Sequence, residues 1–398
     1  MNKVNYKSTL HACYLGYITQ ALIVNLPPLL FVVFQGKFGL NYTMLGSLVV
    51  TIFVTQLIVD ALAIKFVDRI GQRMSAVIAH AFAAVGMITL AFLPRVLPLP
   101  YIGLIISCIL FSIGGGLIEV LISPIVESLP GDAKASAMSL LHSFYSWGQV
   151  LVIIVSTLAL LFVGQDLWFL LPLVWSLLPL FTMFKFMKVP LVPPIEEDKR
   201  TPLKTLFRSK VFLVALLLMV CSGASEQSMS QWASLFAEKG LGISKTLGDI
   251  LGPCMFAVMM GIVRTWYGVK GQNINMQNIL VVCSALCIAS FVITALAPIP
   301  AISLLGCALC GLSVSLMWPG MLSITAAGYP AGGVAMFAIL ALGGDLGCSL
   351  GPQFTGIVAD ASSLNWGLLA AIIFPTIMLI GLVLLKSMLN SKEAKENS

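Results

Sequence analysis

The 398-residue sequence has few charged residues. Asp, Glu, Lys and Arg make up 10% of the chain, where soluble proteins usually carry about 25%. Hydrophobic residues make up 59%, and the mean hydropathy is +1.01. So few charges cannot cover a soluble protein of this length. The composition therefore excludes a soluble globular chain and predicts an all-α integral membrane protein.

Signatures of other protein classes are missing as well. There is no GxxxxGK[ST] phosphate-binding loop, so ATP hydrolysis by this chain has no support. The polar start runs directly into an apolar stretch without an A-x-A-like site, so we expect no cleavable signal peptide. The nine cysteines are scattered, and the lone pair Cys307 and Cys310 has no second pair or His cluster nearby. We expect no enzyme, no cofactor and no metal site.

Long apolar runs fill most of the chain. A membrane-spanning helix needs about 20 mainly apolar residues. The sequence predicts twelve such spans, at 10–34, 44–66, 75–93, 101–126, 137–163, 168–187, 211–235, 247–268, 279–297, 301–324, 333–357 and 365–386. The segment 188–210 is long and rich in proline and charge. We therefore predict an N-terminal six-helix bundle (1–187), a cytoplasmic linker (188–210) and a C-terminal six-helix bundle with a short cytoplasmic tail (211–398).

The positions of the basic residues set an orientation. With the N-terminus in the cytoplasm, 18 of the 22 Lys and Arg residues lie on the cytoplasmic side. Cytoplasmic loops of membrane proteins carry such an excess. We expect a multi-pass protein of the plasma or inner membrane with both termini cytoplasmic. The orientation accounts for most of the basic residues without a nucleic-acid partner, and a monomer in the lipid bilayer is the default expectation.

A short internal repeat supports two related halves. GLIEVLISP, residues 116–124, and GLSVSLMWP, residues 311–319, each place Gly eight residues before Pro in the fourth span of their half. Two parallel halves of six spans are typical of alternating-access transporters that hold their substrate near the membrane midplane. Glu119 corresponds to Val314 in this repeat, so its carboxylate belongs to one half only.

The loop after the second span carries a family resemblance. DRIGQR, residues 68–73, resembles the G-x-x-x-D-R-x-G-R-R signature loop of the major facilitator superfamily. Ile64 stands where that motif begins with Gly, and Gln72 replaces an Arg. The resemblance implies the major facilitator fold, with 12 transmembrane helices in two pseudo-symmetric six-helix bundles.

Four further patches are similar to the fucose-permease-type sugar:proton symporters. They are MSLLHSFYSWG (138–148), EQSMSQW (226–232), GLSVSLMWPGMLSI (311–324) and GCSLGPQFTGIVAD (347–360). In that group a glutamate of span 4 couples transport to protons, and Glu119 matches it in span and approximate depth. The group also carries an aspartate in span 1, where this chain has Gln20 and Asn25 but no carboxylate.

Three residues are the candidates for proton coupling. A carboxylate inside the membrane usually faces a cavity, finds a partner or stays neutral. Glu119 is therefore interpreted as a proton or substrate site, or as a structural carboxylic acid. His142 can partner Glu119 or Glu127, or serve in packing. Asp345 can face the central cavity or pair with a group on span 8 or 10.

The candidates for substrate binding combine amides, a carboxylate and aromatic rings. Carboxylates and amides hydrogen-bond to sugar hydroxyls, and indole rings stack on sugar C–H faces. The residues around Glu226 can alternatively form an outer gate, and Trp318 can instead mark a bend at Pro319. The substrate set is Gln20, Asn25, Glu119, Tyr145, Glu226, Gln227, Gln231, Trp232 and Trp318.

The remaining charges are interpreted as gate residues near the cytoplasmic ends of helices. In the resembled superfamily, the Asp and Arg of the signature loop help to control the inner gate. Arg264 can extend toward the membrane surface or pair with Asp345 or Glu119. The gate set is Asp60, Asp68, Arg69, Arg73, Glu127 and Arg264.

Taken together, the sequence predicts a secondary active transporter that takes up a small polar solute, such as a sugar, together with protons. One alternative is a proton-coupled exporter of amphiphilic drugs or metabolites. A second alternative, of another class, is a membrane receptor that binds a ligand without transporting it.

Overall fold

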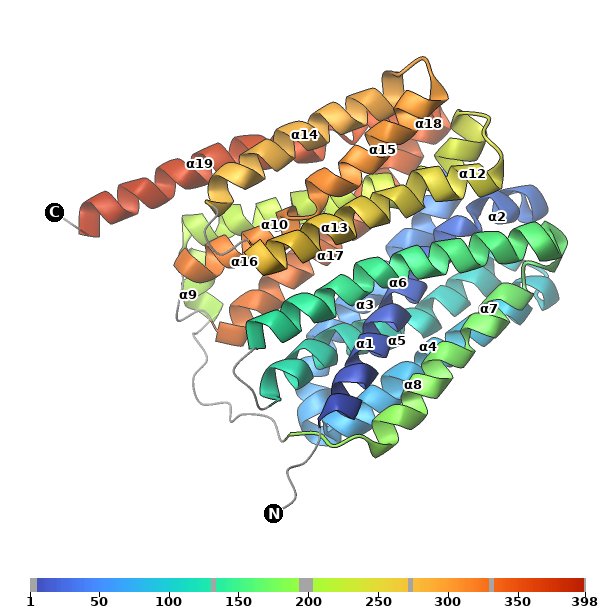
Figure 1. Ribbon diagram of the computed structural model, residues 1–398, viewed down its shortest axis with the longest axis horizontal. Coiled ribbons are helices and arrows are strands. Elements are labelled where there is room, and N and C mark those ends of the chain that lie inside the picture. The colour runs from blue at the N-terminus through green and yellow to red at the C-terminus, as the bar shows by residue number, and fades with distance from the viewer. Residues whose placement is uncertain (1–5, 130–133, 193–202, 271–274, 329–332, 397–398) are drawn as a thin grey trace.

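Figure 1 shows the computed structural model, which describes residues 6–129, 134–192, 203–270, 275–328 and 333–396. The regular secondary structure of these ranges is helical throughout. In Figure 1 the blue-to-green helices lie toward the lower right and the yellow-to-red helices toward the upper left. We call α1 to α8 the N-terminal half and α9 to α19 the C-terminal half; whether each half is an independent bundle stays a prediction.

The N-terminal half follows the predicted spans closely. Pro27 and Pro28 precede a bend of 43° between the first two helices, because proline removes a backbone hydrogen bond. Asn41 then caps the third helix by accepting from the Met44 N–H at 2.8 Å. The helices are α1 (Lys7–Leu29), α2 (Phe31–Phe38), α3 (Tyr42–Ile70), α4 (Gln72–Val96), α5 (Pro100–Ser128), α6 (Lys134–Val163), the 3₁₀ turn η1 (Gln165–Leu167), α7 (Leu170–Trp175) and α8 (Leu177–Lys188).

Several helices of the C-terminal half are interrupted. Two π-helical turns, η2 and η3, lie at the end of the seventh predicted span and the start of the eighth. The helices are α9 (Leu203–Arg208), α10 (Lys210–Ser230), α11 (Ala233–Leu235), η2 (Phe236–Gly240), α12 (Lys245–Asp249), η3 (Ile250–Cys254), α13 (Met255–Lys270), α14 (Met276–Leu296), α15 (Pro300–Val314), α16 (Met317–Gly328), α17 (Gly333–Ala361), α18 (Leu364–Ala370) and α19 (Ile373–Glu396).

Among the described residues, ten helical segments are long and apolar enough to cross a membrane, or eleven if the bent pair α1 and α2 counts as one span. The predicted eleventh span, 333–357, falls within the 29-residue helix α17. The structure thus has the helices that the sequence predicts, and the exact number of twelve spans stays a prediction.

The tenth span is broken just before its proline. α15 ends at Val314 and α16 begins at Met317, whereas α5 continues through Pro124. The two fourth spans of the halves therefore do not bend alike. Since Pro319 has no backbone N–H, it cannot bond to the carbonyl of Ser315 four residues earlier. That carbonyl is left free to accept another donor.

The two halves meet firmly at the end of the bundle that the sequence predicts to face outward. Asp360 of α17 accepts from the N–H groups of Tyr42 and Thr43 at 2.9 and 2.6 Å, and also from the Thr43 hydroxyl. On the other side, the Thr157 hydroxyl of α6 donates to Asp249 at 2.8 Å. Hydrogen bonds thus join the halves on both sides of this end, which is closed.

Candidate functional site

Three carboxyl groups converge in the interior. Asp60 of α3, Glu119 of α5 and Asp345 of α17 each place one oxygen within 4.8 Å of the other two. Asp60 and Asp345 are 8% and 3% exposed, and Glu119 is half-buried. The Asp60 and Asp345 carboxyl groups interact directly although they come from opposite halves. We call these three residues the carboxylate triad.

The glycines before Glu119 make room for the triad. A Cβ on Gly116 would lie 2.8 Å from Oδ1 of Asp60 and 3.0 Å from the Gln56 carbonyl oxygen. A Cβ on Gly115 would lie 2.3 Å from Nε2 of Gln56 and 3.0 Å from Oε1 of Gln20. Because only glycine leaves this space empty, α3 and α1 bring their polar side chains against α5 here. The Gln20 amide also donates to Oε2 of Glu119 at 3.3 Å.

The triad lies in the half of the membrane nearer the predicted cytoplasm. Counted from the helix ends at 1.5 Å per residue, its members lie about 14 to 18 Å from the predicted cytoplasmic ends of their helices. They lie about 24 to 29 Å from the opposite ends. The triad therefore lies nearer the helix ends that the sequence predicts to face the cytoplasm.

Polar atoms around the triad lack partners. Among the described residues, the buried atoms Oδ1 of Asp60, Oδ2 of Asp345, Oε1 of Gln20 and Nε2 of Gln56 have no hydrogen-bond partner. Among the described residues, no ion pair includes a member of the triad. Buried carboxylates without basic partners are costly. Such a cluster is stable when its carboxyl groups are protonated or share a counter-charge.

A second polar group surrounds Arg264 of α13. Its Nη2 lies 3.2 Å from Oε2 of Glu226 on α10, forming a largely buried ion pair. Its Nη1 donates to the Ser146 hydroxyl of α6 at 3.3 Å, and its Nε donates to the Ser315 carbonyl at 3.3 Å. This is the carbonyl that Pro319 leaves without a helical partner. One guanidinium thus connects three helices of the C-terminal half with the N-terminal half.

Amide side chains extend this group along α10. Gln227 donates to Oε1 of Glu226 at 3.4 Å, and Gln231 donates to the Gln227 amide oxygen at 2.8 Å. Across the boundary, Gln149 of α6 donates to the Ser230 hydroxyl at 3.3 Å. All of these side chains are buried. They add buried polar side chains at the boundary between the halves.

Tyr145 and Cys348 complete the interior. The half-buried Tyr145 of α6 contacts the Asn25 side chain and lies within electrostatic range of Glu226 and Arg264. Cys348 lies within the same range of Asp345, Glu119 and Glu226. Groups of both the carboxylate triad and the Arg264 group therefore lie near Cys348. We give one name, the polar strip, to this set of side chains: Arg264, Glu226, Gln227, Gln231, Gln149, Asn25 and Tyr145.

The structure separates the proton-coupling candidates. It brings Glu119 and Asp345 together, but it keeps His142 out of the triad. His142 is exposed, contacts the edge of the Tyr17 ring with 5.3 Å between ring centroids, and lies within electrostatic range of Arg264. Asp60, predicted as a gate contact, instead lies within the triad.

The substrate candidates divide between the polar strip and other places. Asn25, Tyr145, Glu226, Gln227 and Gln231 meet in the strip, whereas Gln20 and Glu119 lie at the triad. Trp232 is fully buried, and its indole N–H donates to the Pro352 carbonyl at 3.0 Å. Its ring packs against Phe31 and Tyr42. The half-buried Trp318 ring lies against Gly344. In this conformation Trp232 closes the predicted outer end.

The gate candidates have varied surroundings. Arg73 donates to the carbonyls of Phe186 and Met187 at 3.0 and 2.8 Å, so it links the start of α4 to the end of α8 within one half. Arg69 is exposed. The side chains of Asp68 and Glu127 lie outside the described residues. Arg264 pairs with Glu226 rather than with Asp345 or Glu119, and it does not extend to the membrane surface.

Sequence reasoning missed several members of the site. Gln56 lies one helical turn before Asp60, and Gln149 one turn after Tyr145, so i,i+4 spacing from known candidates could have found both. Ser146 and the Ser315 carbonyl gave no such signal. They became visible only when α6 and α15 were placed beside Arg264.

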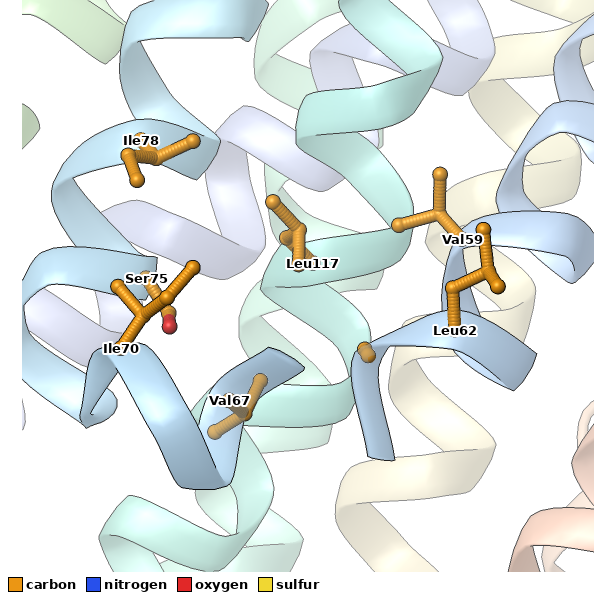
Figure 2. Close-up of a pocket in the computed structure, with 8 residues that line it drawn as sticks. Val59, Leu62, Val67, Ile70, Ser75, Ile78 and Leu117 are labelled. Carbon is orange, nitrogen blue, oxygen red and sulfur yellow. The ribbon is translucent and has the colours of Figure 1, made fainter. Parts of the chain in front are cut away.

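An apolar groove between α3, α4 and α5 is separate from the polar interior. Figure 2 shows its lining, which includes Val59, Leu62, Ile78 and Leu117, around a cavity of about 190 Å³. Leu62 and Ile70 are 51% and 44% exposed. Apart from Ser75, the residues that line this groove are apolar.

A bundle of long apolar helices with charged groups buried inside it is the architecture of a multi-pass membrane protein. The sequence model of the Major Facilitator Superfamily matches residues 13–352. The chain therefore belongs to the major facilitator superfamily, whose members are transporters rather than enzymes.

Solved structures agree on the fold. The chain is similar to a D-xylose-proton symporter, with 15% identity, a TM-score of 0.78 and coverage of 95% of this chain and 96% of that one. The E. coli fucose:proton symporter matches with 14% identity, a TM-score of 0.67 and coverage of 96% and 99%. A nucleoside transporter matches with 13% identity, a TM-score of 0.74 and coverage of 96% and 100%. No curated protein sequence matches the chain.

Proposed function

We propose that the chain is a secondary active transporter that takes up a small polar solute, such as a sugar, together with protons by alternating access. The observation that carries this proposal is the adjacency of two buried polar groups at the boundary between the halves. One is the carboxylate triad, which suits ion coupling. The other is the polar strip, which suits recognition of hydroxyl groups.

The chemistry of the polar strip supports a hydroxylated solute. Glu226 and the amides of Gln149, Gln227 and Gln231 offer both donors and acceptors, and Tyr145 adds a ring with a hydroxyl. A solute with many hydroxyl groups can exchange the hydrogen bonds within the strip for its own. A lipophilic cation would leave these amides unpaired, which costs free energy when they are buried. The strip therefore favours a sugar over an amphiphile.

The triad supplies a mechanism for coupling. Two unit charges 4.8 Å apart repel by about 3.5 kcal/mol at an effective dielectric constant of 20. Conformational states of such proteins differ by only a few kcal/mol. Protonation of the triad thus removes the repulsion and permits α3 and α17 to stay in contact. Loss of the protons restores the repulsion and favours separation of the two helices where the triad lies. Because Asp60 and Asp345 come from opposite halves, proton release is linked directly to separation of the halves.

The proposal is tested by transport into proteoliposomes. Purified protein is screened by thermal shift against labelled glucose, galactose, fucose, xylose and uridine, and any compound that stabilises it is tested for uptake. We expect uptake driven by an inward proton gradient, accompanied by acidification of the interior. A rate of solute uptake that stays unchanged when an uncoupler is added would contradict proton coupling. Binding without flux would indicate a receptor, and outward movement of lipophilic cations without sugar uptake would indicate an exporter.

A further inference from the structure

We infer that the apolar groove between α3, α4 and α5 is a binding site for one phospholipid with an anionic headgroup. An acyl chain of the lipid lies in the groove, and the headgroup lies at the end of the groove that the sequence predicts to face the cytoplasm. This inference goes beyond the proposed function, because it requires neither a particular solute nor a particular coupling ion.

The groove exists because α5 contacts its two neighbours through glycines. A Cβ on Gly114 would lie 2.4 Å from the Ala79 carbonyl oxygen of α4, and a Cβ on Gly116 would lie 3.0 Å from the Gln56 carbonyl oxygen of α3. At about 100° per residue, the Leu117 side chain points between the directions of these two glycines. Leu117 therefore forms the floor of the groove, and α3 and α4 form its walls (Figure 2).

The groove has the length of an acyl chain in one leaflet. Its lining runs along α3 from Val59 to Ile70, which is about 16 Å at 1.5 Å per residue. Half of the hydrocarbon core of a bilayer is about 15 Å thick. The predicted cytoplasmic end of α3 lies at Ile70, so the groove spans the acyl region of the predicted cytoplasmic leaflet.

The size of the groove favours a lipid over a protein partner. A cavity of about 190 Å³ is too small for a helix of another chain, which is about 10–12 Å across with its side chains. Leu62 in the lining and Ile58 one turn earlier are each 51% exposed on the apolar span Tyr42–Ala63. The groove therefore adjoins a surface of α3 that suits lipid tails, and a single hydrocarbon chain fits it.

Basic side chains mark the predicted cytoplasmic end of the groove. Arg69 and Arg73 are both exposed and stand on either side of Gly71 in the sequence. Ile70 and Ser75, which line the groove at this end, are within two residues of these arginines. Basic pockets between membrane helices on the cytoplasmic side bind anionic lipid headgroups. The charge at this end therefore complements a phosphate.

The start of α4 adds a second positive element at the same place. Gly71 precedes α4 with a φ of 86° and offers no side chain as a cap, and the first turn of α4 contains no acidic residue. The first N–H groups of a helix carry partial positive charge and favour a phosphate. A phosphate here also compensates Arg73, a cation in the first turn, where cations are unfavourable.

A lipid in the groove acts on the carboxylate triad through α3 and α5. Val59 and Ala63 line the groove on either side of Asp60 in the sequence, and Leu117 precedes Glu119 by two residues. A chain in the groove stabilises the packing of α3 against α5 that brings Asp60 to Glu119. A ligand that binds one conformation better shifts the equilibrium toward it. Anionic lipid thus favours the arrangement in which the triad is assembled.

Native mass spectrometry of the purified full-length protein tests the inference, with dioleoyl phosphatidylglycerol as the probe and dioleoyl phosphatidylcholine as the neutral comparison. We expect one phosphatidylglycerol per chain to bind more tightly than phosphatidylcholine. Leu62→Trp, which fills the groove, should raise the Kd about 10-fold or more, as expected when about two methylene groups are kept out. Ile58→Trp is the matched control, because Ile58 is as exposed as Leu62 but does not line the groove.

A second pair of variants tests the headgroup contact. Arg69→Gln should raise the Kd about fivefold, whereas Arg208→Gln, which removes an exposed arginine at the end of α9, should leave it unchanged. Equal Kd values of the wild type for the two lipids, or equal effects of Arg69→Gln and Arg208→Gln, would overturn the anionic headgroup. Equal Kd values of Leu62→Trp and Ile58→Trp would overturn the groove as the site.

Thermal unfolding of the wild type keeps the inference testable if the variants fail to fold. Dioleoyl phosphatidylglycerol should raise the midpoint with saturation, whereas dihexanoyl phosphatidylglycerol, which has the same headgroup on short chains, should not. No rise with the long-chain lipid, or equal rises with both lipids, would overturn the acyl-chain site. A dimer that Leu62→Trp dissociates would assign the groove to a second copy of the chain and would also overturn the inference.

The outcomes distinguish this inference from the proposed function. If phosphatidylglycerol binds as described but no solute from the panel crosses the membrane, the lipid site stands and the proposed function fails. If a proton gradient drives solute uptake but phosphatidylglycerol binds no more tightly than phosphatidylcholine, the inference fails and the transporter proposal stands.

Discussion

The carboxyl groups of Asp60 and Asp345 interact directly across the boundary between the two halves. Asp60 belongs to α3 and Asp345 to α17, and the nearby Glu119 of α5 completes the triad. Two carboxyl groups in such contact cannot both stay ionised without a counter-ion. At this contact, the ionisation of the two carboxyl groups and the distance between the two halves therefore depend on each other.

Asp345→Asn should uncouple transport without stopping exchange. The amide cannot ionise, so the repulsion that separates α3 from α17 is lost while the polar strip remains intact. We expect counterflow within about threefold of the wild type and a gradient-driven accumulation ratio near one, consistent with loss of a few kcal/mol of repulsion. Parallel counterflow and accumulation assays in proteoliposomes measure both. Accumulation at the wild-type level would show that Asp345 does not take part in coupling.

Gly116→Ala should destabilise the protein. The added methyl group would lie 2.8 Å from Oδ1 of Asp60, so α3 or the Asp60 side chain must move. Overpacking of this kind costs about 1–3 kcal/mol. Thermal unfolding followed by size-exclusion chromatography measures the loss. Gly36→Ala is the matched control, because a Cβ there meets nothing within 4 Å; an equal effect in both variants would contradict the crowding argument.

Arg264→Ala should destabilise the protein and abolish solute binding, because it leaves Glu226 buried without its partner. Breaking a buried ion pair costs about 3–5 kcal/mol. The double variant Arg264→Ala with Glu226→Gln should recover part of the stability that Arg264→Ala loses, since no charge is left unpaired. The unfolding midpoints of the two single variants and the double variant form a cycle that measures the coupling. Strict additivity would argue against the pair.

Asp360→Asn should open the predicted outer end more often. The Asp360 carboxylate accepts from the first N–H groups of α3 across the boundary between the halves, and losing such a cap costs about 0.5–2 kcal/mol. The open population should therefore rise by about 2- to 30-fold. Ser47→Cys reports this change with a membrane-impermeant maleimide, because Ser47 faces Gln353 of the other half. Unchanged labelling would show that Asp360 does not stabilise the closed end.

Asp166 should contribute no pH dependence in the working range. Its hydrogen bond with Lys37 lowers the pKa of its carboxyl group below the usual value. A lowered pKa means that the contribution is present above the ordinary aspartate pKa and is lost only as the pH falls through the lowered one. Asp166→Asn should therefore show the wild-type pH profile of transport between about pH 5 and 8. A shifted profile would show that the ion pair with Lys37 contributes to the pH dependence.

The fold was largely readable from the sequence, because long apolar runs and the distribution of Lys and Arg leave little choice. The predicted spans correspond to the helices, whereas the bend after Pro27 and Pro28 is seen only in the structure. The repeat places a proline at both positions, yet the helix breaks before Pro319 and continues through Pro124. The break has a local reason, because Arg264 binds the Ser315 carbonyl that Pro319 frees.

The candidate site was only partly readable. Glu119 stood out because a carboxylate among apolar residues is conspicuous, and Glu226 because it begins a polar run. The pairing of Asp60 with Asp345 depends on how α3 and α17 are placed against each other, and 285 positions of sequence separate the two residues. The positions of Asp60 beside Asp345 and of Arg264 beside Glu226 could not be read from the sequence, and the predicted gating roles of Asp60 and Arg264 stay predictions.

The most direct test of the central claim compares wild type with Glu119→Gln in proteoliposomes that carry an inward proton gradient. The labelled solute is the panel member that stabilises the wild-type protein. The account predicts that the wild type accumulates the solute and acidifies the interior, whereas Glu119→Gln exchanges the solute without accumulating it. Accumulation by Glu119→Gln equal to that of the wild type would contradict the account.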